Sequence, residues 1–430
     1  MYAVIGAGPM GLATARNLNK YDIPFIGFDL NSDVGGLWDI DNPHSTMYQS
    51  AHLISSKGMT EFSEFPMPDE VATYPHHSEM KRYFQSYARH FDLYRHYELS
   101  TRVVRVERNG DGWQITTERD GETQSRYFDG VLIANGTLHT PNQPSLPGKF
   151  EGELMHSCDY RDAAVFDGKR VLIVGCGNSA CDIAVDAVHR AASVDLSVRR
   201  GYYFLPKFIG GKPTDSIGGK LKLPRGLKQR LDARLIRLIV GKPGDYGLPE
   251  PSYRMYESHP VINSLVLHHL GHGDITPHGD IVGVVGDTVT FADGQSRVYD
   301  LVLMATGYKL DYPFIDASEL NWHNADAPQL YLNVFHPQYR NLFMMGMVEA
   351  AGLGWEGRNE QAEMVALYIK ARQNQHPEAD KLEKKACAEA GQTLDGGFDY
   401  LKLERMAYYV HKDSYRKAVN AHIADLKQGV

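Results

Sequence analysis

The sequence predicts an α/β protein that contains two three-layer dinucleotide-binding domains. Two glycine-rich turns support this prediction, because residues 6–11 and residues 175–180 each lie between an apolar strand and a helix. Between the turns, residues 150–160 read F-x-G-x-x-x-H-x-x-x-Y, a pattern that arises by chance far less often than either turn. We call residues 150–160 the fingerprint. Its position between the two turns predicts two Rossmann-like folds in one chain.

The composition indicates a globular protein of two or three domains. Hydrophobic residues make up 43% and charged residues 23% of the 430 residues, and the net charge of −8 gives no reason to expect nucleic acid as a partner. The four cysteines lack the spacing of a zinc site or a C-x-x-C motif, so no metal is expected. We find neither a signal-peptide pattern nor an apolar run of about 18 residues. We therefore expect a cytoplasmic protein without a membrane span.

The first turn has the parts of a dinucleotide site. Gly6 permits the tight turn, Gly8 lets the backbone approach a pyrophosphate, and Gly11 allows the helix to pack closely on the strand. The phosphates are expected at the helix N-terminus, where free N–H groups and the helix dipole favour an anion. Asp29 ends the second strand, 18 residues after Gly11, and its carboxylate can accept hydrogen bonds from ribose hydroxyls. The predicted contacts are Gly6, Gly8, Pro9, Met10, Gly11 and Asp29.

The second turn follows the apolar strand of residues 170–174, and a small alanine replaces its third glycine. The next strand, residues 193–198, ends in Arg199 and Arg200, where the first site has an acid. Arginine fits the 2′-phosphate of NADP, because its guanidinium is always charged and donates two parallel hydrogen bonds. Two solvated surface arginines would give the same pattern, and use of NADH beside NADPH stays open. The predicted contacts are Gly175, Gly177, Asn178, Ser179, Ala180, Arg199 and Arg200.

The two sites together are explained most simply by one flavin, as FAD, and one NADPH. The paired glycines of residues 35–36 precede two large apolar residues, and such glycines let the backbone approach a bulky ligand closely. We expect Gly36, Leu37 and Trp38 to line the path toward the flavin ring, although a turn followed by a core tryptophan has the same pattern.

These residues resemble the flavin-containing monooxygenase family, of the bacterial class B type, over nearly the whole chain. The resemblance rests on both turns, the fingerprint, and the stretches 35–38, 62–68, 245–249, 259–263, 305–308 and 331–335. The fingerprint ends in Tyr160, where the related Baeyer–Villiger monooxygenases usually carry Trp, and this favours the first family. The resemblance implies a discontinuous FAD-binding domain, residues 1–160 and 305–430, with an NADPH-binding domain of residues 161–304 inserted into it.

The resemblance also implies an activity. NADPH reduces the FAD, O2 adds to form a C4a-(hydro)peroxyflavin, and a small nitrogen or sulfur nucleophile takes up one oxygen atom. Two alternatives stay open: a Baeyer–Villiger oxygenation of a ketone by the same species, and an uncoupled NADPH oxidase or flavin reductase. We also expect a homodimer.

One segment departs from the family pattern. An ungapped alignment places Ile54 where the family commonly has a polar Asn, and isoleucine cannot donate a hydrogen bond to the flavin or the nicotinamide ribose. Four nearby polar residues are therefore candidates to supply the missing catalytic contact. They are His52, Ser55, Ser56 and Lys57.

Other expectations concern single residues. The resemblance implies that His156 of the fingerprint is a catalytic residue that couples the two domains and the NADP position. A general base is the weaker reading of that role, and a satisfied structural histidine is the alternative. Val104 is expected to present its backbone to the adenine, or else to be part of a core strand. Thr306 and Gly307 are expected to bind cofactor where the chain crosses between the domains, and Gln361 is expected to contact the flavin.

The sequence predicts a basic amphipathic helix in residues 220–242. Leu227, Leu231, Leu235 and Ile239 recur every four positions, and eight Lys or Arg residues accompany a single acid, Asp232. We expect this helix to pack on its own domain or on a dimer partner, and a membrane surface is the alternative.

Overall fold

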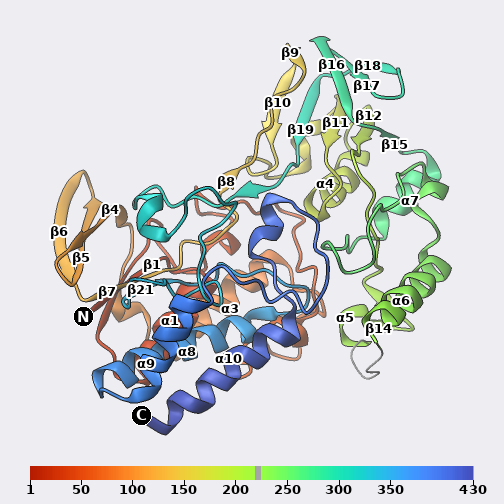
Figure 1. Ribbon diagram of the computed structural model, residues 1–430. Helices are drawn as coiled ribbons and strands as arrows, with labels where there is room; N and C mark the ends of the chain where they lie inside the picture. The colour runs from red at the N-terminus through yellow and green to blue at the C-terminus, as the bar shows by residue number, and fades with distance from the viewer. Residues whose placement is uncertain (218–223, 430) are drawn as a thin grey trace.

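The computed structural model describes residues 1–217 and 224–429, and it contains two lobes (Figure 1). Both chain ends lie in the larger lobe, and the middle of the chain forms the smaller one. Lys220 and Lys222 of the basic stretch lie outside the described residues.

The larger lobe is built on a five-stranded sheet in the order β21-β7-β1-β2-β3. All four strand pairs are parallel, and Ile5 of β1 lies opposite Phe28 of β2 and Ile133 of β7. The strands are β1 (Tyr2–Ile5), β2 (Phe25–Phe28), β3 (Tyr97–Glu98), β7 (Gly130–Ile133) and β21 (Leu342–Met344).

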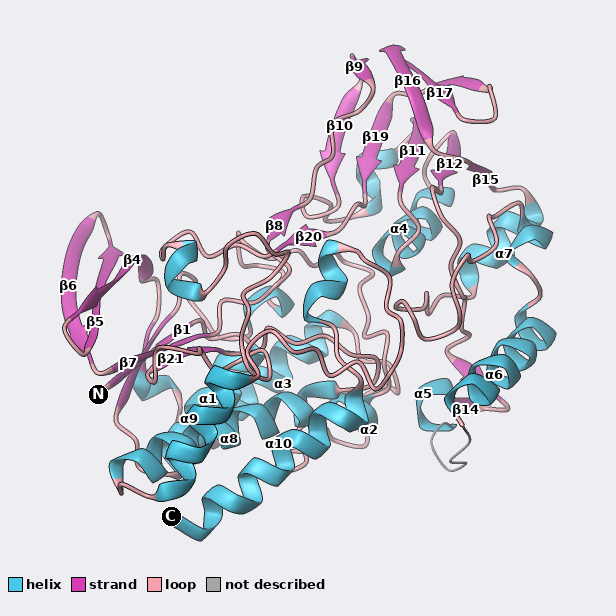
Figure 2. Ribbon diagram, viewed as in Figure 1, coloured by secondary structure: helices cyan, strands magenta, loops and turns pink. Residues whose placement is uncertain are grey.

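Successive residues of β1 supply two different hydrophobic cores, because side chains alternate between the faces of a strand. Val4 packs in the core beneath the helices, and Ala3 packs in the core beneath the antiparallel strands β4-β5-β6. This lobe therefore has three layers, with the helices gathered on one side of the sheet (Figure 2). Its outer elements are α1 (Pro9–Lys20), α2 (Lys57–Thr60), α3 (His77–His90), α8 (Gly354–Gln373), α9 (Pro377–Ala388), α10 (Lys412–Leu426), β4 (Arg102–Asn109), β5 (Gly112–Arg119) and β6 (Glu122–Phe128).

The smaller lobe repeats the scheme with a parallel sheet in the order β10-β19-β11-β12-β15. Ile173 faces a core shared with α4 and α7, whereas Leu172 faces a core shared with the four-stranded sheet β18-β17-β16-β9. The elements are β9 (Gly148–Phe150), β10 (Glu153–His156), β11 (Arg170–Val174), α4 (Asn178–Val188), β12 (Ser193–Ser197), α7 (Leu265–His272), β15 (Ile275–His278), β16 (Ile281–Gly286), β17 (Thr288–Phe291), β18 (Ser296–Val298) and β19 (Leu301–Met304). The predicted fold class, two three-layer nucleotide-binding folds, is confirmed.

The chain crosses between the lobes twice, and the two crossings pair with each other. Strand β8 (Thr140–Pro141) lies antiparallel to β20 (Tyr308–Lys309), and the Thr306 hydroxyl donates to the Asn142 carbonyl at 2.5 Å. The Asn142 amide donates in turn to the Gly307 carbonyl at 2.9 Å. Thr306 and Gly307 thus lie at the crossing, as the resemblance implied.

The fingerprint belongs to the sheets of the smaller lobe. Its first residue ends β9, which pairs with β16, and β10 pairs with β19. The division at residues 160/161 stays a prediction, and this pairing favours a boundary before residue 148.

A projecting part of the smaller lobe holds the rest of the insertion. It comprises β13 (Phe208–Ile209), β14 (Lys212–Pro213), α5 (Thr214–Ile217) and α6 (Arg225–Val240). Helix α6 presents Gln229 and Ile236 to its own domain, and the leucines of the predicted amphipathic face are exposed.

Candidate functional site

The first glycine turn is shaped by close contact with the neighbouring strand. Gly6 has φ +108°, and a Cβ on it would lie 2.4 Å from the carbonyl oxygen of Ala134, just beyond β7. Only glycine fits this position. Helix α1 then begins after Gly8 with no side chain capping it and no acid in its first turn. Its free N–H groups and positive dipole end therefore fit a pyrophosphate, with Pro9, Met10 and Gly11 forming the first turn.

The segment with the paired glycines touches this turn directly. A Cβ on Gly36 would lie 2.9 Å from the Cα of Gly8, so backbone meets backbone there. Leu37 and Trp38 continue as a short 3₁₀ helix, and the Trp38 ring packs edge-on against Trp355. The three residues thus line the entrance of the first turn.

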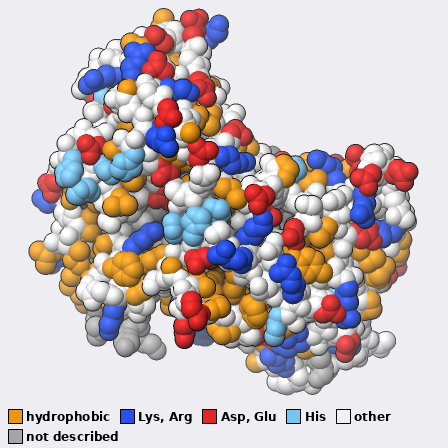
Figure 3. All heavy atoms as spheres, turned by 180° about the vertical axis from the view of Figure 1, so that it is seen from behind, with side chains coloured by type: hydrophobic (Ala, Val, Ile, Leu, Met, Phe, Trp, Pro, Cys, Tyr) orange, Lys and Arg blue, Asp and Glu red, His pale blue; other side chains and the backbone are white. Residues whose placement is uncertain are grey.

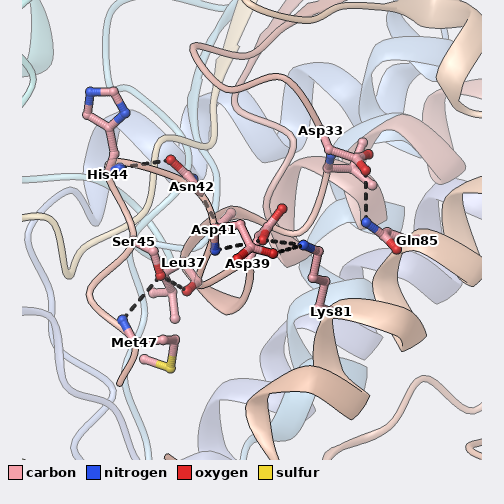
Figure 4. Close-up of polar contacts among 12 residues, drawn as sticks. Asp33, Leu37, Asp39, Asp41, Asn42, His44, Ser45, Met47, Lys81 and Gln85 are labelled. Carbon is pink, nitrogen blue, oxygen red and sulfur yellow. Dashed lines mark hydrogen bonds and ion pairs between the residues drawn. The ribbon is translucent and has the colours of Figure 1, made fainter. Parts of the chain in front are cut away.

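Helix α3 holds this segment in place (Figure 4). Lys81 contacts the carboxylates of Asp39 at 2.6 Å and Asp41 at 2.7 Å, and Gln85 donates to Asp33 at 2.8 Å. These contacts come from one face of α3, since residues four apart lie side by side on a helix.

Two further residues fit the ribose and adenine half of a dinucleotide. The Asp29 carboxylate, 7% exposed, ends β2 and accepts from the backbone amides of Ala7 at 2.5 Å and Asn31 at 2.8 Å. Burial raises its pKa, and these two hydrogen bonds oppose the shift. In β4, Val103 lies opposite Thr117 and Arg105 opposite Thr116, so Val104 is a bulge without a pairing partner in β5. A contact of its backbone with the adenine stays a prediction.

The second turn has the same design. Gly175 has φ +121°, and a Cβ there would lie 2.5 Å from the carbonyl oxygen of Ala305. Helix α4 begins after Gly177, again without a side-chain cap, and a Cβ on Gly177 would meet nothing within 4 Å. Ala180 is fully buried against the strand. The open space in front of an uncapped helix fits a second pyrophosphate.

The polar residues at this turn differ in whether their side chains already have partners within the protein. The Asn178 side chain accepts from the Ile262 amide at 2.7 Å, so any cofactor contact would come from its backbone, whereas Ser179 is exposed. Arg200 donates to the Tyr202 hydroxyl at 3.1 Å and stacks on that ring. Among the described residues neither Arg199 nor Arg200 pairs with a carboxylate, whereas Arg190 does, with Asp167. The two arginines are therefore available to an anion.

Two carboxylates of α4 tie the lobes together. The Tyr160 hydroxyl, at the end of the fingerprint, donates to Asp186 at 2.9 Å, and Ser50 of the larger lobe also donates to Asp186. One turn earlier, Asp182 accepts from Tyr48 at 3.2 Å and from Asn263 at 2.6 Å. No motif in the sequence indicates either acid. The one signal is their spacing of four in a helix whose other residues after Ser179 are apolar or small.

His156 is fully buried at the end of β10, and its ring packs edge-on against Tyr308 at the crossing. Its Nδ1 accepts from the Cys158 amide at 3.1 Å, and its Nε2 has no partner among the described residues. Burial lowers the pKa of His156, so the ring is neutral at pH 7. This placement suits a coupling residue at the crossing better than a general base.

The polar candidates around Ile54 are engaged elsewhere in the protein. Ser56 donates to Asp215 of α5 at 2.9 Å, and the Ser55 hydroxyl lies 2.7 Å from that of Thr60. The Lys57 ammonium donates to three backbone carbonyls of residues 68–71. His52 is exposed and contacts the Ser50 carbonyl at 2.8 Å. The structure therefore brings these four side chains to protein partners and not into one cluster, and their catalytic role stays a prediction.

Gln361 is fully buried in α8. Its carbonyl accepts from the Gly346 amide at 2.8 Å, and its amide donates to the Tyr415 hydroxyl at 2.5 Å. Both ends of the side chain thus join parts of the larger lobe, and a flavin contact by Gln361 stays a prediction.

In the described part of the chain, no three His, Cys, Asp or Glu side chains are arranged to hold a metal. Of the helices that the structure describes, none is long and apolar enough to span a bilayer.

Comparisons with known proteins agree with this arrangement. The family model of flavin-binding monooxygenase-like proteins matches residues 1–424. Flavin-containing monooxygenase 5 from Mus musculus is 32% identical over 81% of this chain and 69% of its own length. The N-oxide-forming dimethylaniline monooxygenase 2 from Oryctolagus cuniculus is 31% identical over the same shares.

Two solved structures share the fold. The S-allyl-L-cysteine S-oxygenase from Allium sativum has a TM-score of 0.68 at 21% identity, over 98% of this chain and 88% of its own. A mutant cyclohexanone monooxygenase from Rhodococcus sp. Phi1, bound to NADP+, has a TM-score of 0.74 at 20% identity, over 100% and 98%. The chain belongs to the flavin-binding monooxygenase-like family and is a flavin-dependent monooxygenase that uses FAD and NADPH.

Proposed function

We propose that this monooxygenase transfers one oxygen atom of O2 to a small molecule with a nucleophilic nitrogen or sulfur atom. The observation that carries the proposal is the pair of uncapped helix N-termini, α1 and α4, each behind a glycine turn and joined across the lobes by Asp182 and Asp186. N-oxide formation, the activity for which the rabbit relative is named, supports the nitrogen nucleophile. When bound, FAD and NADPH supply the redox chemistry that reduces and activates O2.

The residues of the chain bind and orient the cofactors in this proposal. The N-terminus of α1 and Asp29 hold FAD, and the Val104 backbone contacts its adenine. The N-terminus of α4 holds the NADPH pyrophosphate, and Arg199 with Arg200 holds the 2′-phosphate. The His156 ring supports the crossing, where it packs edge-on against Tyr308.

One observation favours a second candidate function. Ile54 offers no hydrogen bond, and its polar neighbours are already engaged by protein groups. Where a hydrogen-bond donor is missing, two other outcomes compete with oxygenation of a nitrogen or sulfur atom. They are NADPH consumption without product and oxygenation of a ketone. The cytoplasmic location and the homodimer expected from the sequence stay predictions.

The product distribution tests the proposal. We expect NADPH-dependent uptake of O2 with a tertiary amine or thioether, and one ¹⁸O atom from ¹⁸O2 in the N-oxide or sulfoxide, measured by mass spectrometry. A cyclic ketone should give little lactone. Release of one hydrogen peroxide per NADPH with every substrate would contradict the proposal, and lactone as the main product would favour the second candidate.

The 2′-phosphate site is tested by replacing both Arg199 and Arg200 with Ala. We expect the KM for NADPH to rise about tenfold or more, because two charge-assisted contacts are lost, and the KM for NADH to change little. Steady-state kinetics with both donors measure this, and Arg190→Ala, an exposed arginine that pairs with Asp167, is the control. Equal increases for both donors would remove the assignment.

The departure at position 54 is tested by Ile54→Asn. We expect the fraction of NADPH recovered as oxygenated product to rise roughly 2–10-fold, as a net hydrogen bond of roughly 0.5–1.5 kcal/mol allows. The ratio of product to hydrogen peroxide measures it. Ile54→Val adds no polar group and should leave the ratio unchanged, and the same increase in both variants would rule out a hydrogen bond as the cause.

The tie between the lobes is tested by a double-mutant cycle of Tyr160→Phe and Asp186→Asn. We expect each change to increase the share of NADPH lost as hydrogen peroxide, and the double variant to resemble Asp186→Asn alone, because both remove the same hydrogen bond. The control pair Tyr160→Phe with Tyr299→Phe should be additive, since Tyr299 bonds to Asp195 of β12 and not to α4. Additive effects in the first cycle would show that the two residues act separately.

A further inference from the structure

Helix α6 carries an apolar face that no described part of the protein covers. Its five members are 43–83% exposed, and they are Leu227, Leu231, Leu235, Leu238 and Ile239. At 3.6 residues per turn they occupy one arc of about 120° on the helix. Gln229 and Ile236, which are buried, lie on the other side and attach the helix to its own domain. The exposed arc is therefore a second face, distinct from the packing face. We call it the leucine face.

The charge around the leucine face is positive. Arg230, Arg234 and Arg237 lie along one flank of it, one helical turn apart, and all three are exposed. Asp232 is the only acid of the helix, and it is already engaged by Lys228 and by the Tyr256 hydroxyl at 2.6 Å. Among the described residues Arg230 and Arg234 pair with no carboxylate, whereas Arg237 contacts Glu250 at 3.2 Å. The helix thus offers free cations beside a broad apolar arc.

We propose that α6 docks the protein on an anionic lipid surface. The leucine face enters the boundary between headgroups and acyl chains, and Arg230 with Arg234 contacts the phosphate groups. An exposed apolar arc beside arginines is the pattern of a helix that lies in the plane of a membrane interface. Anionic headgroups attract each such cation, and the attraction weakens as salt is added. The inference goes beyond the oxygenation reaction and does not depend on the substrate.

A second copy of this chain fits the leucine face less well. If two α6 helices pack face to face in antiparallel order about a two-fold axis, the arginine flank of one meets the arginine flank of the other. If they pack in parallel order, the arginine flank meets Arg225 and Lys228, and Asp232 is the single acid available. Like charges oppose both arrangements, whereas a lipid surface of opposite charge favours the same flank.

The placement of α6 is compatible with such docking. It lies at the outer edge of the smaller lobe, on the side away from the sheet of the larger lobe (Figure 1). Hydrophobic side chains gather at the lower left of the molecule in Figure 3, the region of α6. Attachment through this edge leaves the two glycine turns free.

Vesicle flotation of the FAD-loaded full-length protein tests the proposal. We expect binding to phosphatidylcholine vesicles that contain phosphatidylglycerol, little binding to pure phosphatidylcholine, and release at high salt. Leu238→Glu, at the most exposed position of the face (83%), should weaken binding about tenfold or more. Arg230→Glu combined with Arg234→Glu should do the same while the leucines remain.

The control is Leu265→Glu, which changes a leucine of α7 that is 58% exposed and lies outside the leucine face. It should bind vesicles as the wild type does, and flavin content and NADPH oxidation should be unchanged in every variant. If Leu238→Glu loses flavin, Leu238→Gln replaces it. Absence of binding to the anionic vesicles, equal binding to both kinds, or equal loss in Leu265→Glu would overturn the proposal. A dimer that Leu238→Glu dissociates in sedimentation velocity, without vesicle binding, would assign the face to a second copy.

Discussion

The relation between the two candidate nucleotide sites depends on a pair of half-buried carboxylates. Asp182 and Asp186 lie on the helix whose N-terminus forms the second turn, and they accept hydrogen bonds from Tyr48 and Ser50 of the larger lobe. Burial raises the pKa of Asp182, and the nearby Lys207 charge and the hydrogen bonds from Asn263 and Tyr48 oppose that cost. A shift of either lobe would remove donors from these half-buried carboxylates. The hydrogen bonds of Tyr48 and Ser50 therefore help to hold α4 in place relative to the first turn.

These contacts between the lobes explain the role of the fingerprint. It begins in β9, passes through β10 to His156 at the crossing, and ends with the Tyr160 hydroxyl on Asp186. One short segment thus contacts both the crossing between the lobes and helix α4, the proposed NADPH-binding helix. Phenylalanine at position 160 could fill the same space, but it could not donate to Asp186.

Local sequence patterns predicted the turns. They could not predict side-chain partners that lie far apart in the sequence, or which face of a helix packs on the protein. Gly6 was predicted to permit a tight turn, its positive φ agrees with that, and Gly175 has a positive φ at the corresponding position of the second turn. The hydrogen bond from Ser56 to Asp215 joins residues 159 positions apart, so no local sequence pattern predicts it. The period of four in residues 227–239 predicted an amphipathic helix, but periodicity does not tell which face packs. The structure buries Gln229 and Ile236 and exposes the leucines, so the helix packs on its own domain through a face other than the leucines. Packing of the leucines on a dimer partner stays a prediction.

At Ile54, too, the sequence shows one fact and the three-dimensional contacts another. The departure from the family pattern is visible in the sequence. Whether a neighbour compensates is a question of three-dimensional contacts, and the structure gives Ser55, Ser56 and Lys57 other partners within the protein. Moving Ser56 toward position 54 would remove a hydroxyl donor from Asp215, and moving Lys57 would remove the ammonium donor from the carbonyls of residues 68–71. Both changes have a cost in lost hydrogen bonds. An isoleucine at this position excludes water but holds no polar group. On the proposed assignment, this chain therefore relies more on desolvation than on hydrogen bonding at that point, and coupling of NADPH to product is the property most sensitive to it.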